Sequence, residues 1–136
     1  MTGALVLFST LAVASALGLL LKNHNGKLRA PAAANLPAAV RAALDPAAAV
    51  TLVQLSTTFC APCRQARALL SDLAARTDGL HHAELDLTER PELARELSVL
   101  RTPTTLAISG SGAEILRVGG VPRRAELLAA LAPHLG

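Results

Sequence analysis

The sequence has very few aromatic side chains. Among its 136 residues only Phe8 and Phe59 are aromatic, and Trp and Tyr are absent. Because proteins that bind single-stranded nucleic acids stack the bases on aromatic side chains, this composition argues against such binding. Charged residues are also scarce, at 17% of the chain against 51% hydrophobic residues. The chain is therefore too apolar for a disordered protein, and part of it is expected to contact lipid.

The excess of positive charge lies in one short stretch. The chain has 13 Lys and Arg residues against 10 Asp and Glu residues, which gives a formal net charge of +3. Lys22, Lys27 and Arg29 account for this excess, and they follow directly after an apolar run. Such a basic cluster is typical of the flank of a membrane span. The pattern favours a lipid bilayer as a partner and argues against a nucleic acid.

Residues 3–21 form an apolar run without any charged side chain. A helix needs about 20 such residues to cross the hydrocarbon core of a bilayer. The small residues at positions 14–16 resemble the cleavage site of a secretory signal peptide, but the apolar run continues beyond them and no Lys or Arg precedes it. We interpret residues 1–21 as an uncleaved transmembrane anchor. A cleaved signal peptide and a buried helix of a soluble protein are the alternatives.

The flanks of the run predict which way the anchor is oriented. Lys and Arg are absent before the run and cluster after it. By the positive-inside rule, this asymmetry favours a cytoplasmic domain after the span, and the extracytoplasmic side is the alternative. Residues 22–35 combine basic residues with the turn formers Asn23, Asn25 and Gly26, so we interpret them as a juxtamembrane tether.

The remaining residues, 36–136, have the length of one small domain. Their apolar periodicity and turn residues predict an alternation of helices and strands. The predicted helices are 36–44, 64–76, 91–100 and 122–131, and the predicted strands are 50–55, 81–87, 104–109 and 114–118. This order implies an α/β domain with a mixed central sheet and helices on both faces.

The two cysteines of the chain form a Cys60-Ala61-Pro62-Cys63 motif between the first predicted strand and the following helix. Two intervening residues let the first helical turn bring both sulfurs together, so a disulfide can form and reopen. A helix N-terminus stabilises a thiolate, most of all on the first cysteine. We therefore predict that Cys60 attacks a substrate disulfide and that Cys63 resolves the mixed disulfide.

A zinc site is the alternative interpretation of the two cysteines. Structural zinc needs four ligands, and the histidines are poorly placed to complete the set. His81 and His82 are adjacent on a predicted strand, where successive side chains point to opposite faces, while His24 and His134 lie near the two ends. We therefore predict no metal, and we interpret His81 and His82 as structural.

From residue 36 to its C-terminus, the sequence resembles the thioredoxin family. The resemblance rests on residues 59–64 around the cysteines, on residues 101–104, and on residues 118–120 before the last helix. It implies a thioredoxin-like fold in which Pro103 is a cis-proline facing the disulfide and the backbone of Thr102 pairs with a bound substrate strand. It also implies that Gly119 lies close to the cysteines and leaves room for an extended substrate.

The sequence departs from the best-known thioredoxins near the cysteines. Gln54 stands where they have a buried aspartate, and Glu84 stands near their partner lysine. Gln54 cannot take a proton as a carboxylate does, and Glu84 replaces that carboxylate only if it points inward. Arg64, next to Cys63, stabilises the thiolate, binds substrate, or is a solvated side chain of the helix. We treat Gln54, Arg64 and Glu84 as candidate modulators of the cysteine pair.

Together these features predict a membrane-tethered thiol–disulfide oxidoreductase. Its substrates are protein thiols and disulfides, its redox partner is a dithiol electron donor or acceptor, and it needs no cofactor besides its own Cys60–Cys63 pair. A cytoplasmic domain favours a protein-disulfide reductase. The alternative is a non-enzymatic subunit that uses the same fold to dock in a membrane complex, since a fold alone does not determine function.

Overall fold

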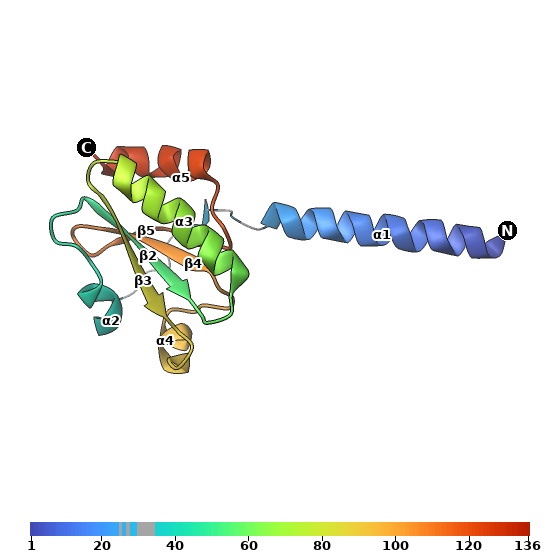
Figure 1. Ribbon diagram of the computed structural model, residues 1–136, viewed down its shortest axis with the longest axis horizontal. Helices are drawn as coiled ribbons and strands as arrows, with labels where there is room; N and C mark the ends of the chain where they lie inside the picture. The colour runs from blue at the N-terminus through green and yellow to red at the C-terminus, as the bar shows by residue number, and fades with distance from the viewer. Residues whose placement is uncertain (25, 27, 30–34) are drawn as a thin grey trace.

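The computed structural model describes residues 1–24, 26, 28, 29 and 35–136 (Figure 1). The other residues of the predicted tether, Lys27 among them, lie outside the described part. The chain begins with the 23-residue helix α1 (Thr2–His24). Its segment Thr2–Asn23 has a mean hydropathy of 2.3 and is 0% buried. The alternative of a buried helix in a soluble protein is therefore wrong, and α1 is long and apolar enough to cross a membrane.

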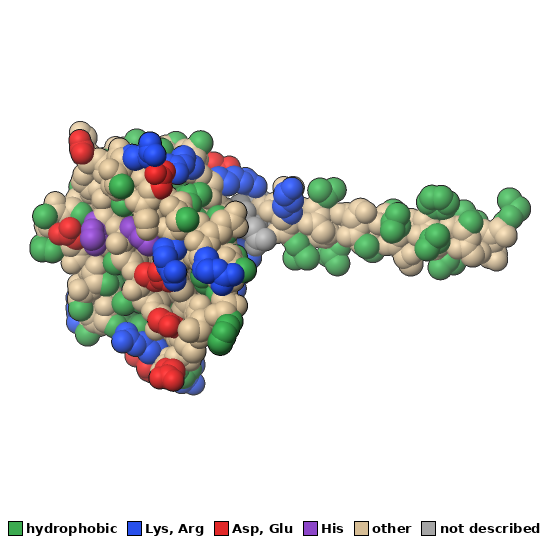
Figure 2. All heavy atoms as spheres, viewed as in Figure 1, with side chains coloured by type: hydrophobic (Ala, Val, Ile, Leu, Met, Phe, Trp, Pro, Cys, Tyr) green, Lys and Arg blue, Asp and Glu red, His purple; other side chains and the backbone are tan. Residues whose placement is uncertain are grey.

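Hydrophobic side chains line α1, and charged side chains are spread over the domain that follows it (Figure 2). In a soluble protein, a helix of this composition buries most of its surface. An apolar helix of this length near the N-terminus can be a transmembrane helix or part of a signal peptide, so α1 agrees with both interpretations made from the sequence.

The core of the domain is a mixed sheet, as the sequence predicts, with five strands where four were expected. Its strands are β1 (Leu28–Arg29), β2 (Val50–Ser56), β3 (Leu80–Asp86), β4 (Thr104–Ser109) and β5 (Glu114–Gly119). They are arranged in the order β1-β5-β4-β2-β3, and only the pair of β2 and β3 is parallel among the strands that the structure describes. All residues of β2 are buried, because it is the inner strand that pairs with both β3 and β4.

Helices cover both faces of this sheet (Figure 1). They are α2 (Ala38–Ala42), α3 (Ala61–Arg76), α4 (Pro91–Glu96) and α5 (Arg124–Leu131). On one face, α3 and α5 pack against alternate residues of β2 that include Val50 and Leu52. On the other face, α2 and α4 pack against Val53 and Leu55. Gln54, which is two residues beyond Leu52 on β2, therefore points to the α3 face.

The predicted helix 91–100 is too long, because α4 ends at Glu96. Ser98 adopts a φ of 53°, in the left-handed region. Its N–H donates to the Arg95 carbonyl oxygen at 3.0 Å, and the Val99 N–H donates to the Ala94 carbonyl oxygen at 2.8 Å. These two bonds form a Schellman motif, which ends a helix by satisfying its last carbonyl groups. Glycine usually marks this motif in a sequence, and here serine takes its place.

The other helices differ from prediction at their ends. α2 occupies only the middle of the predicted segment 36–44. α3 begins three residues before the predicted Arg64, with Cys60 as its N-cap, because Pro62 is compatible with the first helical turn. α5 begins two residues after the predicted start at residue 122.

The segment interpreted as a tether contains a short strand. β1 pairs antiparallel with β5, with Leu28 opposite Val118 and Arg29 opposite Arg117. The Gly26 N–H adds a hydrogen bond of 2.8 Å to the Gly119 carbonyl oxygen. The sheet thus extends into the predicted tether, and β1 covers part of an edge of β5 that would otherwise lack a partner.

Replacing Leu70 by Ala is expected to destabilise the domain strongly. Leu70 lies on α3, is 0% exposed and packs against the sheet. Removing its methyl groups leaves a cavity, which costs about 2–5 kcal/mol of unfolding free energy. The control is Leu100→Ala, because the Leu100 side chain is 96% exposed. Denaturant unfolding of the full chain in detergent measures both variants, and equal losses would contradict this account of the core.

Candidate active site

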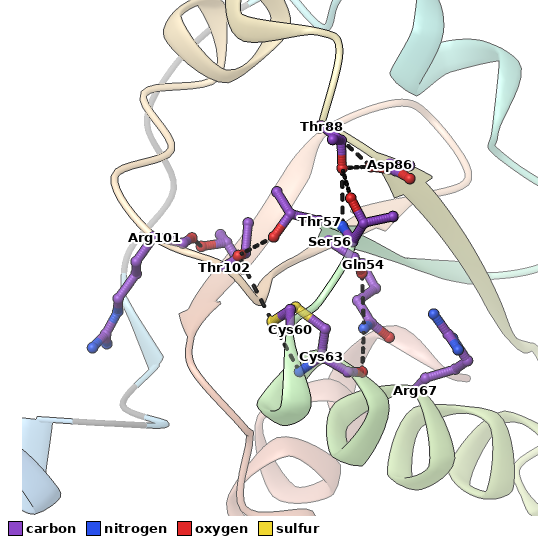
Figure 3. The surroundings of a disulfide bond; sticks show 12 residues. Gln54, Ser56, Thr57, Cys60, Cys63, Arg67, Asp86, Thr88, Arg101 and Thr102 are labelled. Carbon is purple, nitrogen blue, oxygen red and sulfur yellow. Dashed lines mark hydrogen bonds between the residues drawn. A yellow bond between two sulfur atoms is a disulfide. The ribbon is translucent and has the colours of Figure 1, made fainter.

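The two cysteines lie where β2 leads into α3 (Figure 3). They form a disulfide with a sulfur–sulfur distance of 2.08 Å. Cys60 is the N-cap of α3, and its Sγ accepts a hydrogen bond of 3.2 Å from the Cys63 N–H. Phe59 turns the chain into the helix with a φ of 59°, and its side chain is fully exposed. The disulfide is therefore located at the helix N-terminus, as the sequence predicts.

The two sulfurs differ in their access to solvent. Cys63 is 1% exposed, whereas Cys60 is only partly buried. The Thr102 hydroxyl points to Cys60 and lies 3.8 Å from its Sγ. After reduction, the Cys63 N–H and the Thr102 hydroxyl can both donate to a Cys60 thiolate, and such donors lower the pKa of a thiol. This arrangement fits the roles predicted from the sequence for the two cysteines.

The loop before β4 faces the disulfide. The Thr102–Pro103 peptide bond is cis, as the resemblance implies. The Thr102 hydroxyl also lies 3.1 Å from the Thr57 hydroxyl of the loop after β2. A shallow groove of about 310 Å³ runs along this loop, and it is lined by Pro62, Gln65, Arg101, Thr102, Pro103, Gly120 and Val121. The structure thus places Thr102 and Pro103 beside the first turn of α3.

Gly119 has a different surrounding from the expected open space. The Arg101 guanidinium lies over it and donates from Nη2 to the Gly119 carbonyl oxygen at 2.9 Å. A Cβ atom at position 119 would come within 2.9 Å of Arg101 Nε. Any other residue at position 119 would therefore require the flexible Arg101 side chain to move. Arg101 was not among the site residues predicted from the sequence.

Gln54 connects the central strand to the helix that carries the cysteines. Its side chain is 0% exposed, and its Nε2 donates to the Cys63 carbonyl oxygen at 2.9 Å and to Ser56 Oγ at 3.1 Å (Figure 3). Its Oε1 lies 3.0 Å from Nε2 of His82. The amide is thus hydrogen-bonded at both ends, as a buried amide must be to offset its desolvation.

His82 completes this network and was not predicted to be part of the site. Because an amide oxygen only accepts hydrogen bonds, His82 Nε2 must carry the hydrogen that Gln54 binds. The other ring nitrogen, Nδ1, lies 3.1 Å from Ser71 Oγ on α3 and accepts from it when the ring is neutral. The signal in the sequence was two adjacent histidines on a strand, which shows only that one of them points inward.

Glu84 faces the same side of the sheet as Gln54, but it is paired with a basic residue. Both carboxylate oxygens accept from the Arg67 guanidinium, with Nη2 at 2.7 Å from Oε1. This hydrogen bonding is the largest effect on the Glu84 carboxyl and lowers its pKa, and Ser56 and the Arg67 charge act in the same direction. Glu84 is therefore ionised at neutral pH, so it does not hold a proton for Cys63 as a buried acid does.

Arg64 is exposed on the first turn of α3. It lines a groove of about 230 Å³ together with both cysteines, Phe59, Arg67 and Glu84. Among the described residues, no group of three or more His, Cys, Asp and Glu side chains is placed to hold a metal ion. The arrangement supports thiol chemistry at Cys60 with a positive charge nearby.

The chain resembles known proteins over the domain that holds this site. A family model described as Thioredoxin matches residues 33–133. The bifunctional thioredoxin reductase/thioredoxin of Mycobacterium leprae is 35% identical over 78 residues, which are 57% of this chain and 17% of that protein. The thioredoxin of Mycobacterium tuberculosis is also 35% identical over 78 residues, and the match spans 66% of its length. The thioredoxin of Staphylococcus saprophyticus is 31% identical over 87 residues, or 83% of its length.

Solved structures agree with these matches. A thioredoxin from Nicotiana alata superimposes with a TM-score of 0.56 and 25% identity, covering 64% of this chain and 74% of that one. The thioredoxin pre-protein of Schistosoma mansoni gives a TM-score of 0.54 at 23% identity, with 65% and 81% of the two chains covered. The second of these shows likeness of fold alone.

Protonation of His82 is expected to destabilise the domain. Burial is the largest effect on the ring and lowers its pKa below the ordinary value, although the Glu84 carboxylate raises it in part. An unfolded chain has a histidine pKa of about 6.5, so it takes up the proton first as the pH falls. The stability that the neutral ring contributes is therefore fully present above about pH 6.5 and is lost as the pH falls through the lower pKa of the folded state.

The measurement is the unfolding free energy of the full chain in detergent, taken at several values between about pH 7.5 and pH 5. His82→Gln is expected to flatten the decline, because Gln cannot titrate. His134→Gln, which changes an exposed ring near the C-terminus, is the control and keeps the wild-type slope. A decline that persists in His82→Gln would contradict this assignment. The carboxyl groups with lowered pKa values, such as Glu84, act only at lower pH.

Proposed function

Because the chain belongs to the thioredoxin family, we propose that it is a membrane-tethered thiol–disulfide oxidoreductase that exchanges disulfides with protein substrates. The observation that carries this proposal is the Cys60–Cys63 disulfide at the N-terminus of α3, with the first sulfur accessible and the second buried. The facing loop with Thr102 and Pro103 supports it, because it leaves a groove beside the first turn of α3 in which an extended peptide fits.

Reduction of a substrate proceeds in two exchange steps. The Cys60 thiolate attacks one sulfur of the substrate disulfide, forms a mixed disulfide and expels the other substrate sulfur as a thiolate. That thiolate takes the proton of the Cys63 thiol. The Cys63 thiolate then attacks Cys60 Sγ, which restores the Cys60–Cys63 disulfide and releases the second substrate thiolate. Two electrons pass from the protein to the substrate, and a dithiol protein returns them by the same steps in reverse.

Burial determines which cysteine plays which role. A substrate sulfur must approach the attacking thiolate along the line of its own disulfide, so this thiolate has to be accessible. Cys60 meets this condition and Cys63, at 1% exposure, does not. The Cys63 N–H donates to Cys60 Sγ, so the same residue that stabilises the attacking thiolate also holds the resolving sulfur beside it.

Gln54, a neutral amide, stands where the best-known thioredoxins have a buried aspartate that can hold a proton. Gln54 binds the Cys63 carbonyl oxygen and cannot accept a proton from the thiol. Glu84 is ionised by its pairing with Arg67. In this proposal Cys63 therefore gives its proton directly to the thiolate that leaves the substrate, and the exchange needs no further acid or base.

The tether and the side of the membrane are part of the same proposal. α1 supports an anchor by its length and apolar surface, and Lys22 at its C-terminal end supports a cytoplasmic domain by the positive-inside rule. In the cytoplasm, disulfides are kept reduced, so there the protein acts as a protein-disulfide reductase that another dithiol protein recharges.

Cys63→Ser is expected to accumulate mixed disulfides between Cys60 and substrate proteins. The first exchange step proceeds in this variant, but the resolving sulfur is missing. Gel electrophoresis without reductant, after acid quenching, detects the adducts as bands that disappear with reductant. Cys60→Ser is the matched control and is expected to trap none, because the remaining sulfur is buried. Equal trapping in both variants would contradict the roles given to the two cysteines, and trapping in neither would favour a docking subunit over an enzyme.

The full chain is expected to remain in membranes after alkaline extraction and to keep its N-terminal residues. An uncleaved span of this hydropathy stays in the bilayer, whereas a cleaved signal leaves a shorter protein in the soluble fraction. Mass spectrometry of the extracted protein distinguishes the two.

On intact cells, a membrane-impermeant thiol reagent added after a permeant reductant should leave Cys60 unlabelled if the domain is cytoplasmic. Labelling of Cys60 without lysis would place the domain outside.

A further inference from the structure

Gly26 and β1, the N-terminal segment that follows α1, contact the domain beside the active site. The sheet order places β1 on the outer side of β5, with Leu28 opposite Val118. Ahead of this pair, the Gly26 N–H donates to the Gly119 carbonyl oxygen at 2.8 Å. Gly26 and β1 are thus held by main-chain hydrogen bonds to one edge of the sheet.

The position of Gly26 requires a glycine. Its φ of 74° lies in the left-handed region, and a Cβ atom there would come within 2.6 Å of the Val121 carbonyl oxygen. Both features disfavour any other residue at this position. The contact of Gly26 with the segment after β5 is therefore a close approach of two backbones and depends on the absence of a side chain.

This contact lies on the wall of the groove beside the disulfide. Gly119, which accepts the bond from Gly26, is followed by Gly120, whose N–H donates to the Pro103 carbonyl oxygen at 2.7 Å. Gly120 and Val121 line the groove together with Pro103 and Pro62. The same Gly119 carbonyl oxygen also accepts from Arg101. The N-terminal segment is thus attached to the side of the domain on which the substrate groove opens.

Chain length then limits the distance between the end of α1 and Gly26, which contacts the wall of this groove. α1 ends at His24, and Gly26 is two residues further on. Two residues span at most about 7 Å even when fully extended. In Figure 1, α1 leaves the domain on the side where the first turn of α3 lies. If α1 crosses a bilayer, the groove beside the first turn of α3 therefore lies close to the membrane surface.

We infer that the substrates of the Cys60–Cys63 pair are disulfides in the juxtamembrane segments of membrane proteins. This inference rests on the proposed function of the pair and of α1. A short docked tether holds the groove close to the membrane surface, where such a segment lies. The effective concentration of a juxtamembrane disulfide at the groove is therefore higher than that of a soluble disulfide. Exposed Arg64, in the groove with both cysteines, also suits a site next to anionic lipid.

The test compares two placements of one flexible Gly/Ser spacer of about 20 residues. In the first variant, the spacer follows His24 and moves the docked domain away from the end of α1. In the matched control, it follows residue 32, so that Gly26 and β1 keep both their short connection to α1 and their bonds to the domain. Both variants contain the same added residues, and they differ only in whether the groove stays close to the membrane.

The substrates form a matched pair too. The membrane substrate is a single-span peptide with a disulfide loop within about five residues of its span, reconstituted with the protein in phosphatidylcholine and phosphatidylglycerol vesicles. The soluble substrate is the same loop without the span. The rate of reduction by the pre-reduced full chain is followed by mass spectrometry after alkylation.

We expect the spacer after His24 to slow reduction of the membrane substrate about tenfold, while the control spacer changes it less than about twofold. Both variants should reduce the soluble substrate at the wild-type rate. Equal rates of all three proteins on the membrane substrate, or an equal loss in both spacer variants, would overturn the inference. A wild-type protein that reduces neither substrate would instead overturn the proposed function.

Discussion

The hydrogen bond from the Gln54 amide to the Cys63 carbonyl oxygen connects the buried central strand to the helix that carries the cysteines. β2 is held on both sides by its neighbours, so Gln54 has a fixed position, and its amide fixes the first turn of α3 in relation to the sheet. His82 holds the other end of the amide, and Ser71 of α3 holds His82. The geometry of the disulfide thus depends on a neutral network that begins and ends on the same helix.

A neutral network has an electrostatic consequence for the cysteines. A buried carboxylate next to a thiol raises the pKa of that thiol, because two negative charges in a medium of low polarity repel. Gln54 removes this charge, and the Glu84 carboxylate, which lines the same groove as the cysteines, is compensated by Arg67 in a partly exposed ion pair. Thiolates at this site therefore meet hydrogen-bond donors and positive charge rather than a buried anion. Because Gln54 cannot take a proton, the departure from a buried aspartate removes one acceptor for the proton of Cys63.

Elements that depend on a local sequence pattern could be predicted from the sequence, whereas residues that depend on tertiary contacts could not. The inner strands and the cysteine motif were predicted because apolar runs and turn residues mark them directly. The end of α4 was missed because Ser98 replaces the usual glycine of a Schellman motif. His82 and Arg101 were missed for a different reason: their partners, Gln54 and Gly119, are 28 and 18 positions away in the sequence. A single sequence carries no signal for such pairs.

The strand β1 was also not predicted from the sequence. Two residues are too few to be recognised as a strand, and they lie in a segment whose basic and turn-forming residues indicate a linker. Their pairing follows from the unpaired edge of β5, which any short extended segment can cover. Because that edge ends at Gly119, covering it also brings the chain to the groove beside the first turn of α3. The bonds that protect the edge of the sheet are therefore the same bonds that set the distance between the disulfide and the end of α1.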